Sequence, residues 1–108
     1  MRSISKSPII TDAAHPHPGF GLREDLLEPM GQSVDDVARA TRLSAARIAA
    51  VLDGRVPIDA TFDLRFGRYF GFSPGYFMRL QLQHDIAAAR ISAATELDAI
   101  IPLQIAAE

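Results

Sequence analysis

Apolar side chains recur every three or four residues along most of the chain, which is the spacing of an amphipathic helix. Glycine, proline and capping residues divide this pattern into separate runs. The pattern therefore predicts an all-α fold. The five expected helices cover about residues 19–28, 34–41, 45–53, 58–70 and 74–94.

The boundaries of these helices carry their own signals. Ser33 and Ser44 are expected N-caps, because a serine hydroxyl accepts one of the backbone N–H groups that a first helical turn leaves unpaired. Pro29 ends the first helix, since the residue before a proline avoids the helical conformation. Ser73 followed by Pro74 predicts a cap and then the first residue of the last helix, where proline needs no N–H.

Composition divides the chain into three parts. Residues 1–17 contain serines, prolines and histidines without a sustained apolar period, so we expect a flexible N-terminal arm. Residues 18–95 carry the helical pattern of one folded domain. Residues 96–108 are apolar but contain Pro102, so this tail is either a frayed end or a segment that a partner orders.

Length and composition narrow the function classes. A chain of 108 residues, 48% of them hydrophobic, builds one modest core, which excludes many enzyme architectures. The chain has no cysteine, and therefore no disulfide, thiolate nucleophile or cysteine-bound metal. No uncharged stretch approaches the roughly 18 residues of a membrane-spanning helix, and the N-terminus does not resemble a signal peptide. We expect a cytoplasmic protein without a membrane partner.

Signals for catalysis or metal binding are weak. His15 and His17 have no third ligand nearby, so they are interpreted as flexible arm residues rather than a metal site. The carboxylates of Asp35 and Asp36 point about 100° apart on a helix, which does not suit general acid–base catalysis. No serine, histidine and acid form a nucleophile motif. The sequence therefore predicts neither an enzyme nor a bound metal or cofactor.

The second and third expected helices have the dimensions of a helix-turn-helix, because both are short and two or three residues join them. In that motif the second helix inserts its N-terminal residues into the DNA major groove. The formal net charge of −2 does not indicate a nucleic-acid partner. Four arginines nevertheless lie across this region: Arg39, Arg42, Arg47 and Arg55.

A series of short motifs follows the same region in order. They are residues 17–19 (HPG), 22–24 (LRE), 27–31 (LEPMG), 54–58 (GRVPI), 68–71 (RYFG) and 73–77 (SPGYF). In their order and separation, over about residues 17–90, these motifs resemble the HigA/VapI-type antitoxins. Those are Xre-like, phage-repressor-like helix-turn-helix proteins.

The resemblance implies an antitoxin that acts as a homodimer. Such a protein represses its own operon by binding double-stranded operator DNA, and it neutralises a small RelE-like toxin, an mRNA-cleaving ribonuclease. The resemblance and the arginine pattern together indicate a set of DNA-contacting positions. These are Ser33, Arg39, Arg42, Ser44, Ala45, Ala46, Arg47, Ala50 and Arg55.

The sequence departs from the family pattern at two places. Alanines stand at positions 45, 46 and 50, where repressors of this type present base-reading side chains. Because a methyl group contacts only a thymine methyl, discrimination falls on Arg47 or on DNA shape. Arg42 stands where the turn usually holds glycine, at a cost on the order of 1 kcal/mol.

Simpler roles compete with these functional ones. Ser33 and Ser44 cap helices whether or not they also lie near phosphates. Arg47 is either a base contact or a solvated side chain, and Arg39 either contacts a phosphate or pairs with an aspartate one turn earlier. For the whole protein two alternatives stay open. One is a stand-alone repressor, and the other is a protein-interaction module that has lost DNA readout.

Overall fold

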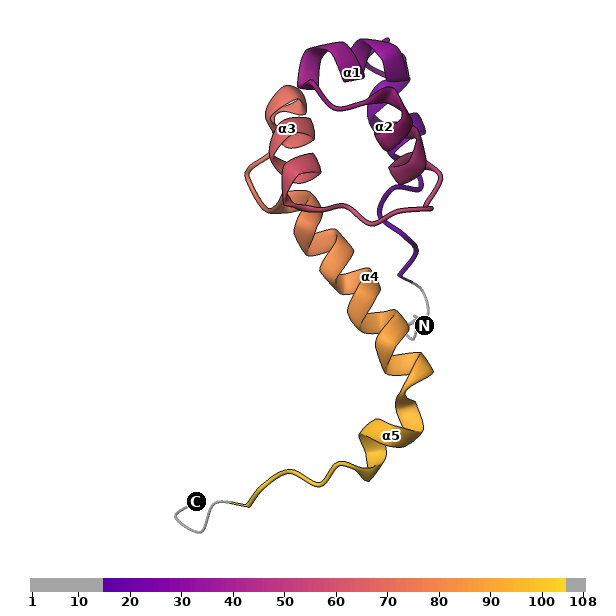
Figure 1. Cartoon of the computed structure of the whole chain (residues 1–108), viewed down its shortest axis with the longest axis vertical. Helices are drawn as coiled ribbons and strands as arrows, with labels where there is room; N and C mark the ends of the chain where they lie inside the picture. The colour runs from indigo at the N-terminus through magenta and orange to yellow at the C-terminus, as the bar shows by residue number, and fades with distance from the viewer. Residues whose placement is uncertain (1–14, 105–108) are drawn as a thin grey trace, which may run out of the picture.

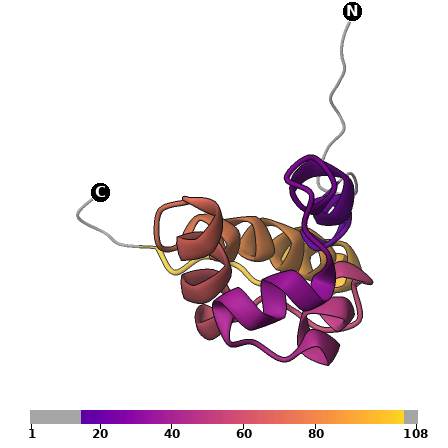
Figure 2. The ribbon, with the colours of Figure 1, turned by 90° about the horizontal axis from the view of Figure 1, so that it is seen from above.

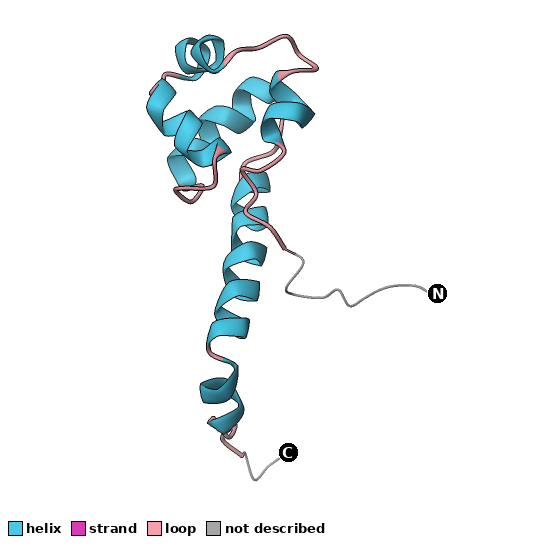
Figure 3. Cartoon of the chain, turned by 90° about the vertical axis from the view of Figure 1, so that its right-hand side faces the viewer, coloured by secondary structure: helices cyan, strands magenta, loops and turns pink. Residues whose placement is uncertain are grey.

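The computed structural model describes residues 15–104, and all regular structure in this range is helical (Figure 3). The all-α class is therefore confirmed. Residues 1–14 of the expected arm and 105–108 of the expected tail lie outside the described residues. The elements are η3 (Arg23–Leu27), α1 (Val34–Thr41), α2 (Ala45–Leu52), α3 (Ala60–Phe70), α4 (Tyr76–Ser92) and α5 (Ala94–Ala99).

The helices form a globular head with a long helical projection. The head holds η3, α1, α2, α3 and the start of α4, whereas the rest of α4 extends away and α5 lies at its far end (Figure 1). The view from above shows α1, α2 and α3 gathered over one end of this projection (Figure 2). No helix within residues 15–104 is both long and apolar enough to cross a bilayer.

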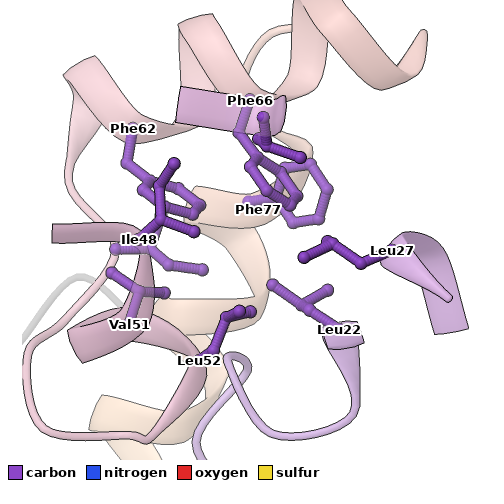
Figure 4. Close-up of a cluster of buried hydrophobic side chains, with 10 residues drawn as sticks. Leu22, Leu27, Ile48, Val51, Leu52, Phe62, Phe66 and Phe77 are labelled. Atoms are coloured by element: carbon purple, nitrogen blue, oxygen red, sulfur yellow. The ribbon is translucent and has the colours of Figure 1, made fainter. Parts of the chain in front are cut away.

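The core of the head is a cluster of fully buried apolar side chains. Phe62 and Phe66 of α3 stack with ring centroids 4.7 Å apart, and the ring of Phe77 from α4 meets Phe66 at 5.3 Å (Figure 4). Ile48 and Val51 of α2 pack into the same cluster. Burial of each such side chain contributes about 1.5–3 kcal/mol, so this cluster joins α2 and α3 to the root of the projection.

The first helix is shorter and wider than expected. Instead of an α-helix over 19–28, the chain forms a π-helical turn in which the N–H of Glu28 donates to the carbonyl of Arg23 at 2.8 Å. Gly21 has φ +90°, a left-handed conformation that interrupts any helix beginning at residue 19.

The segment before η3 is packed against the head, so the expectation of a flexible arm reaching residue 17 is wrong. His17 is buried; its Nδ1 accepts the N–H of Gly19 at 2.9 Å, and its Nε2 lies 2.9 Å from the carbonyl oxygen of Val56. A Cβ at Gly19 would lie 1.8 Å from the carbonyl oxygen of Val51. Only glycine allows this close approach.

The last long helix begins later than expected, at Tyr76 rather than at Pro74. Its N-terminal donors are satisfied from α3: the buried carboxylate of Asp63 accepts the N–H groups of Gly75 at 2.6 Å and Phe77 at 2.8 Å. Gly75 has φ +93°, which prevents a helix from starting at Pro74. After α4 ends, α5 occupies residues that include the start of the expected tail.

Candidate nucleic-acid interface

α1 and α2 form the helix-turn-helix that the sequence predicted. Val37 of α1 and Ile48 and Val51 of α2 are fully buried and fix the packing of the pair. The hydroxyl of Thr41, at the end of α1, donates to the carbonyl oxygen of Val37 at 2.7 Å and accepts the N–H of Leu43 at 3.3 Å. These bonds fix the turn that sets the direction of α2 relative to α1.

The turn itself contains Arg42 in a left-handed conformation, with φ 65° and ψ 21°. It is the one non-glycine residue with positive φ among residues 15–104. Its backbone N–H donates to the carbonyl of Ala38 at 2.9 Å, which closes α1. The Arg42 side chain is exposed. Arg42 therefore adopts a left-handed backbone conformation that glycine usually occupies, and its charged side chain is exposed.

Both serine N-caps lie where the sequence placed them. The Ser33 hydroxyl accepts the N–H of Asp36 at 3.0 Å while the Asp36 carboxylate accepts the N–H of Ser33 at 2.9 Å, which is a capping box. The Ser44 hydroxyl accepts the N–H of Arg47 at 3.0 Å. The N–H and then the hydroxyl of Ser33 lower the pKa of Asp36, so its carboxylate stays charged at the helix N-terminus.

Arg39 is paired with an aspartate, which is the simpler of its two expected roles. Its Nη2 lies 2.7 Å from Oδ1 of Asp36, one turn earlier on α1. The arginine side chain is 73% exposed and the pair is open to water. Exposed pairs of this kind contribute little to stability, so Arg39 is easily drawn to another anion.

The alanines of α2 do not all face solvent. Ala46 is exposed and Ala45 is half-buried, both in the first turn. Ala50 is only 8% exposed, so the expectation that it lies on the DNA-reading face is wrong. The apolar face of this eight-residue helix is wide enough to carry Ala50 inward together with Val51 and Leu52.

Arg47 is held by a carboxylate that sequence inspection did not single out. Its Nη2 lies 2.6 Å from Oδ2 of Asp59, whose other oxygen accepts the N–H of Phe62 at 2.9 Å and so caps α3. The N–H of Phe62, and then Arg47, lower the pKa of Asp59. An aspartate before an apolar helical run is a recognisable cap signal, but its partner lies on another helix.

Two further arginines lie beside the α1–α2 helix pair. Arg55 follows α2 and is 64% exposed, with Nη2 3.4 Å from Oδ2 of Asp53. Arg65 of α3, which the sequence analysis did not select, donates from Nη1 to the carbonyl of Thr41 at 3.1 Å and so braces the turn. The helix-turn-helix thus presents exposed cations beside two capped helix N-termini, an arrangement suited to binding phosphates.

No model of a known protein family matches the chain. It is 36% identical over 87 residues to Virulence-associated protein I of Dichelobacter nodosus, and the alignment covers 81% of this chain and 80% of that protein. The solved structure of Pseudomonas aeruginosa antitoxin HigA with the higBA promoter matches with TM-score 0.76 at 31% identity, over 83% of this chain and 99% of that one.

A second solved structure leads to the same family. It is an addiction module antidote protein of the HigA family from Coxiella burnetii, which matches with TM-score 0.75 at 28% identity, over 82% of this chain and 98% of that chain. The helix-turn-helix geometry and the extent of these similarities agree with the order of motifs in the sequence. The chain belongs to the HigA/VapI-type family of helix-turn-helix antitoxins.

Proposed function

We propose that this protein is the antitoxin of a type II toxin–antitoxin module and the repressor of its own operon, acting in the cytoplasm as a homodimer. The observation that carries the proposal is the first turn of α2. It is capped by Ser44, contains Arg47 and the exposed Ala46, and follows a turn that presents Arg42. A similar HigA antitoxin was solved with its promoter, which supports a DNA ligand for this surface.

In the proposed complex the N-terminus of α2 enters the major groove. The methyl group of Ala46 contacts a thymine methyl, and Arg47 exchanges its carboxylate partner for a guanine. Phosphates lie against the capped helix ends and against Arg42 and Arg55, with Arg39 released from its aspartate. In a dimer the two recognition helices reach successive major grooves about 34 Å apart.

The helical projection supports a dimer. Along α4 and α5 several large apolar side chains are 46% to 57% exposed, so burying them against another surface would be favourable. A second copy that covers them removes this surface from water. The residues are Leu82, Ile86, Ile91 and Leu97.

The proposed protein partner is a small RelE-like ribonuclease. Membership of the HigA/VapI-type antitoxin family supports this class of partner. The experiment is co-expression with a RelE-like reading frame from the neighbourhood of the chain's own gene. That reading frame is expected to arrest growth when it is expressed alone. Co-expression of this chain is expected to restore growth, and the two proteins are expected to co-purify. Restoration without a stable complex would contradict direct neutralisation.

DNA binding is tested on fragments from upstream of the chain's own gene, by fluorescence anisotropy at several salt concentrations. Affinity is expected to fall steeply as salt rises, because phosphate contacts release counterions. Arg47→Ala is expected to weaken binding by roughly tenfold or more, as loss of a base contact does. Arg79→Ala removes one exposed arginine from α4 and is the matched control. Equal effects of the two substitutions would exclude the α2 surface.

One observation favours a second candidate function. Because Asp59 already holds Arg47, and alanines fill the neighbouring positions, the helix pair also suits a protein-interaction module that no longer reads DNA. That candidate predicts capture of the toxin together with weak binding to every duplex, without preference for the chain's own promoter.

A further inference from the structure

An open groove lies on the head between the last turn of α1, the outer face of α3 and the connection from α3 to α4. Its volume is about 910 Å³. Leu64, Tyr69 and Phe72 supply apolar surface, and Leu64 and Tyr69 are 53% and 42% exposed. Arg65 and Arg68 line the same groove. No acidic residue and no residue of α2 contributes to its lining.

The groove therefore combines apolar surface with two unneutralised cations. Arg65 donates to the carbonyl oxygen of Thr41, and within residues 15–104 neither arginine is paired with a carboxylate. Such a lining is complementary to a segment that carries aliphatic side chains together with acidic ones. The lining offers no such complementarity to a strongly hydrophobic segment that carries no charges.

This chain contains a segment with that composition, residues 96–104, which we call the acidic tail. Its aliphatic side chains are the most exposed of the large apolar side chains in the described range: Ile100 is 66% exposed, Ile101 82% and Leu103 90%. Glu96 and Asp98 lie in the same segment and form no ion pair within the described range. After α5 the backbone is extended, and Pro102 prevents a further helical turn.

The acidic tail is far from the groove of its own chain. α5 and residues 100–104 lie at one end of the molecule, whereas α1 and α3 lie at the other, separated by α4 (Figure 1). The 17 residues of α4 span about 25 Å. An acidic tail that occupied this groove would therefore belong to another molecule.

We propose that the groove of each protomer binds the acidic tail of a second copy of this chain. Arg65 and Arg68 then face Glu96 and Asp98 of the second copy, and its isoleucines and leucine cover the apolar part of the groove. Two identical contacts related by a twofold axis close the dimer. Because α2 contributes nothing to the groove, the recognition helices stay free. This inference rests on the dimer of the proposed function and specifies its surface.

Charge reversal on the full-length chain tests the proposal. The groove variant carries Arg65→Glu and Arg68→Glu, and the tail variant carries Glu96→Arg and Asp98→Arg. Self-association is measured by sedimentation velocity over a concentration series, with circular dichroism to confirm folding. Each variant alone is expected to associate at least about tenfold more weakly than the wild type, because like charges then face each other.

Mixing the two variants is the decisive experiment. In the mixed dimer each groove again meets a tail of opposite charge, so a heterodimer of near wild-type affinity is expected although each variant alone self-associates only weakly. If the groove variant does not fold, Arg68→Glu paired with Asp98→Arg replaces the double substitutions, because Arg68 makes no ion pair in the described chain.

The remaining outcomes separate this inference from the function on which it rests. A monomeric wild-type chain would remove the proposed dimer and the inference together, before any substitution is made. A dimeric wild type whose variants stay monomeric on mixing, or dimerise unchanged alone, overturns only the groove contact. Groove variants that stay dimeric but lose promoter DNA or the toxin assign the groove to that ligand and overturn the inference.

Discussion

The guanidinium of Arg47 lies 2.6 Å from the carboxylate of Asp59, and this pair joins the first turn of α2 to the cap of α3. The Arg47 side chain is 37% exposed, and its Nε is buried without a hydrogen-bond partner. Arg47 is therefore oriented by the head itself and is not a freely moving surface cation. For Arg47 to contact a base, DNA must compete with Asp59.

Removing the charge of Asp59 is expected to strengthen promoter binding. Asparagine is a good N-cap, so Asp59→Asn keeps the acceptor for the N–H of Phe62 while releasing Arg47. We expect affinity to rise by roughly threefold to tenfold, because a competing carboxylate no longer faces the DNA. Fluorescence anisotropy at fixed salt measures the change.

The same substitution in the Arg47→Ala background is the control. If Asp59 acts through Arg47, Asp59→Asn changes little there, and the two substitutions are strongly coupled. An equal gain in both backgrounds would show that Asp59 only adds general repulsion, and Arg47 would lose its assigned role.

Sequence inspection predicted α1 and α2 closely because their boundaries have local causes. Ser33 and Ser44 each accept an N–H three residues ahead, a relationship visible in the sequence itself. The start of α4 has a distant cause. Its donors are satisfied by Asp63 of α3, which only tertiary packing brings to that place, so the local pattern at Ser73 indicated a wrong start.

The distinction between local and distant causes also explains which features of the candidate site could be predicted from the sequence. The left-handed turn at Arg42 was predictable, because the sequence shows a non-glycine residue at a position that the family fills with glycine. The pairing of Arg47 with Asp59 and the burial of Ala50 were not, since both depend on where α3 and the core lie relative to α2. Local sequence thus predicted which residues belong to the helix-turn-helix surface, but not which partners their side chains have or which of them are buried.

Arg42→Gly is expected to change stability and DNA binding in opposite directions. Stability should rise by about 0.5–1 kcal/mol, because the left-handed conformation costs a side chain roughly 1–2 kcal/mol and glycine's greater unfolded-state freedom offsets part of the gain. Promoter affinity should fall, with a salt dependence shallower by about one counterion. Urea unfolding and salt-dependent anisotropy measure the two effects. Arg42→Lys retains the charge and the strain, so it should change neither quantity much.

Asp63→Ala is expected to destabilise the protein by about 3 kcal/mol, because it leaves buried backbone donors at the start of α4 without a charged acceptor. Urea unfolding followed by circular dichroism gives the free energy. Amide exchange should accelerate first at Phe77 and Met78, whose N–H groups Asp63 accepts. Glu24→Ala, which removes an exposed carboxylate from η3, is the control and should have almost no effect. A small loss for both would mean that other contacts position α4.

Stability is expected to fall as the pH drops below about 6.5, because the pKa of His17 is lowered from its ordinary value of 6.5. Burial is the main cause. A hydrogen bond to Val56 and the charge of Asp85 oppose it, while nearby His84 adds to it. The hydrogen bonds agree, since Nδ1 accepts the N–H of Gly19 and cannot also carry a proton.

The sign follows from proton binding. Well above pH 6.5 His17 is neutral in both the folded and the unfolded chain, and the full stabilisation is present. As the pH falls, the unfolded chain binds the proton first, so the free energy of unfolding decreases. For one proton this decrease is at most about 1.4 kcal/mol per pH unit. Urea unfolding between pH 5 and about pH 8 measures this slope, well above the range in which Asp36 and Asp59 titrate. His17→Gln removes the titrating ring and should flatten the slope even though it lowers stability at every pH. An unchanged slope in this variant would mean that burial of His17 does not oppose its protonation.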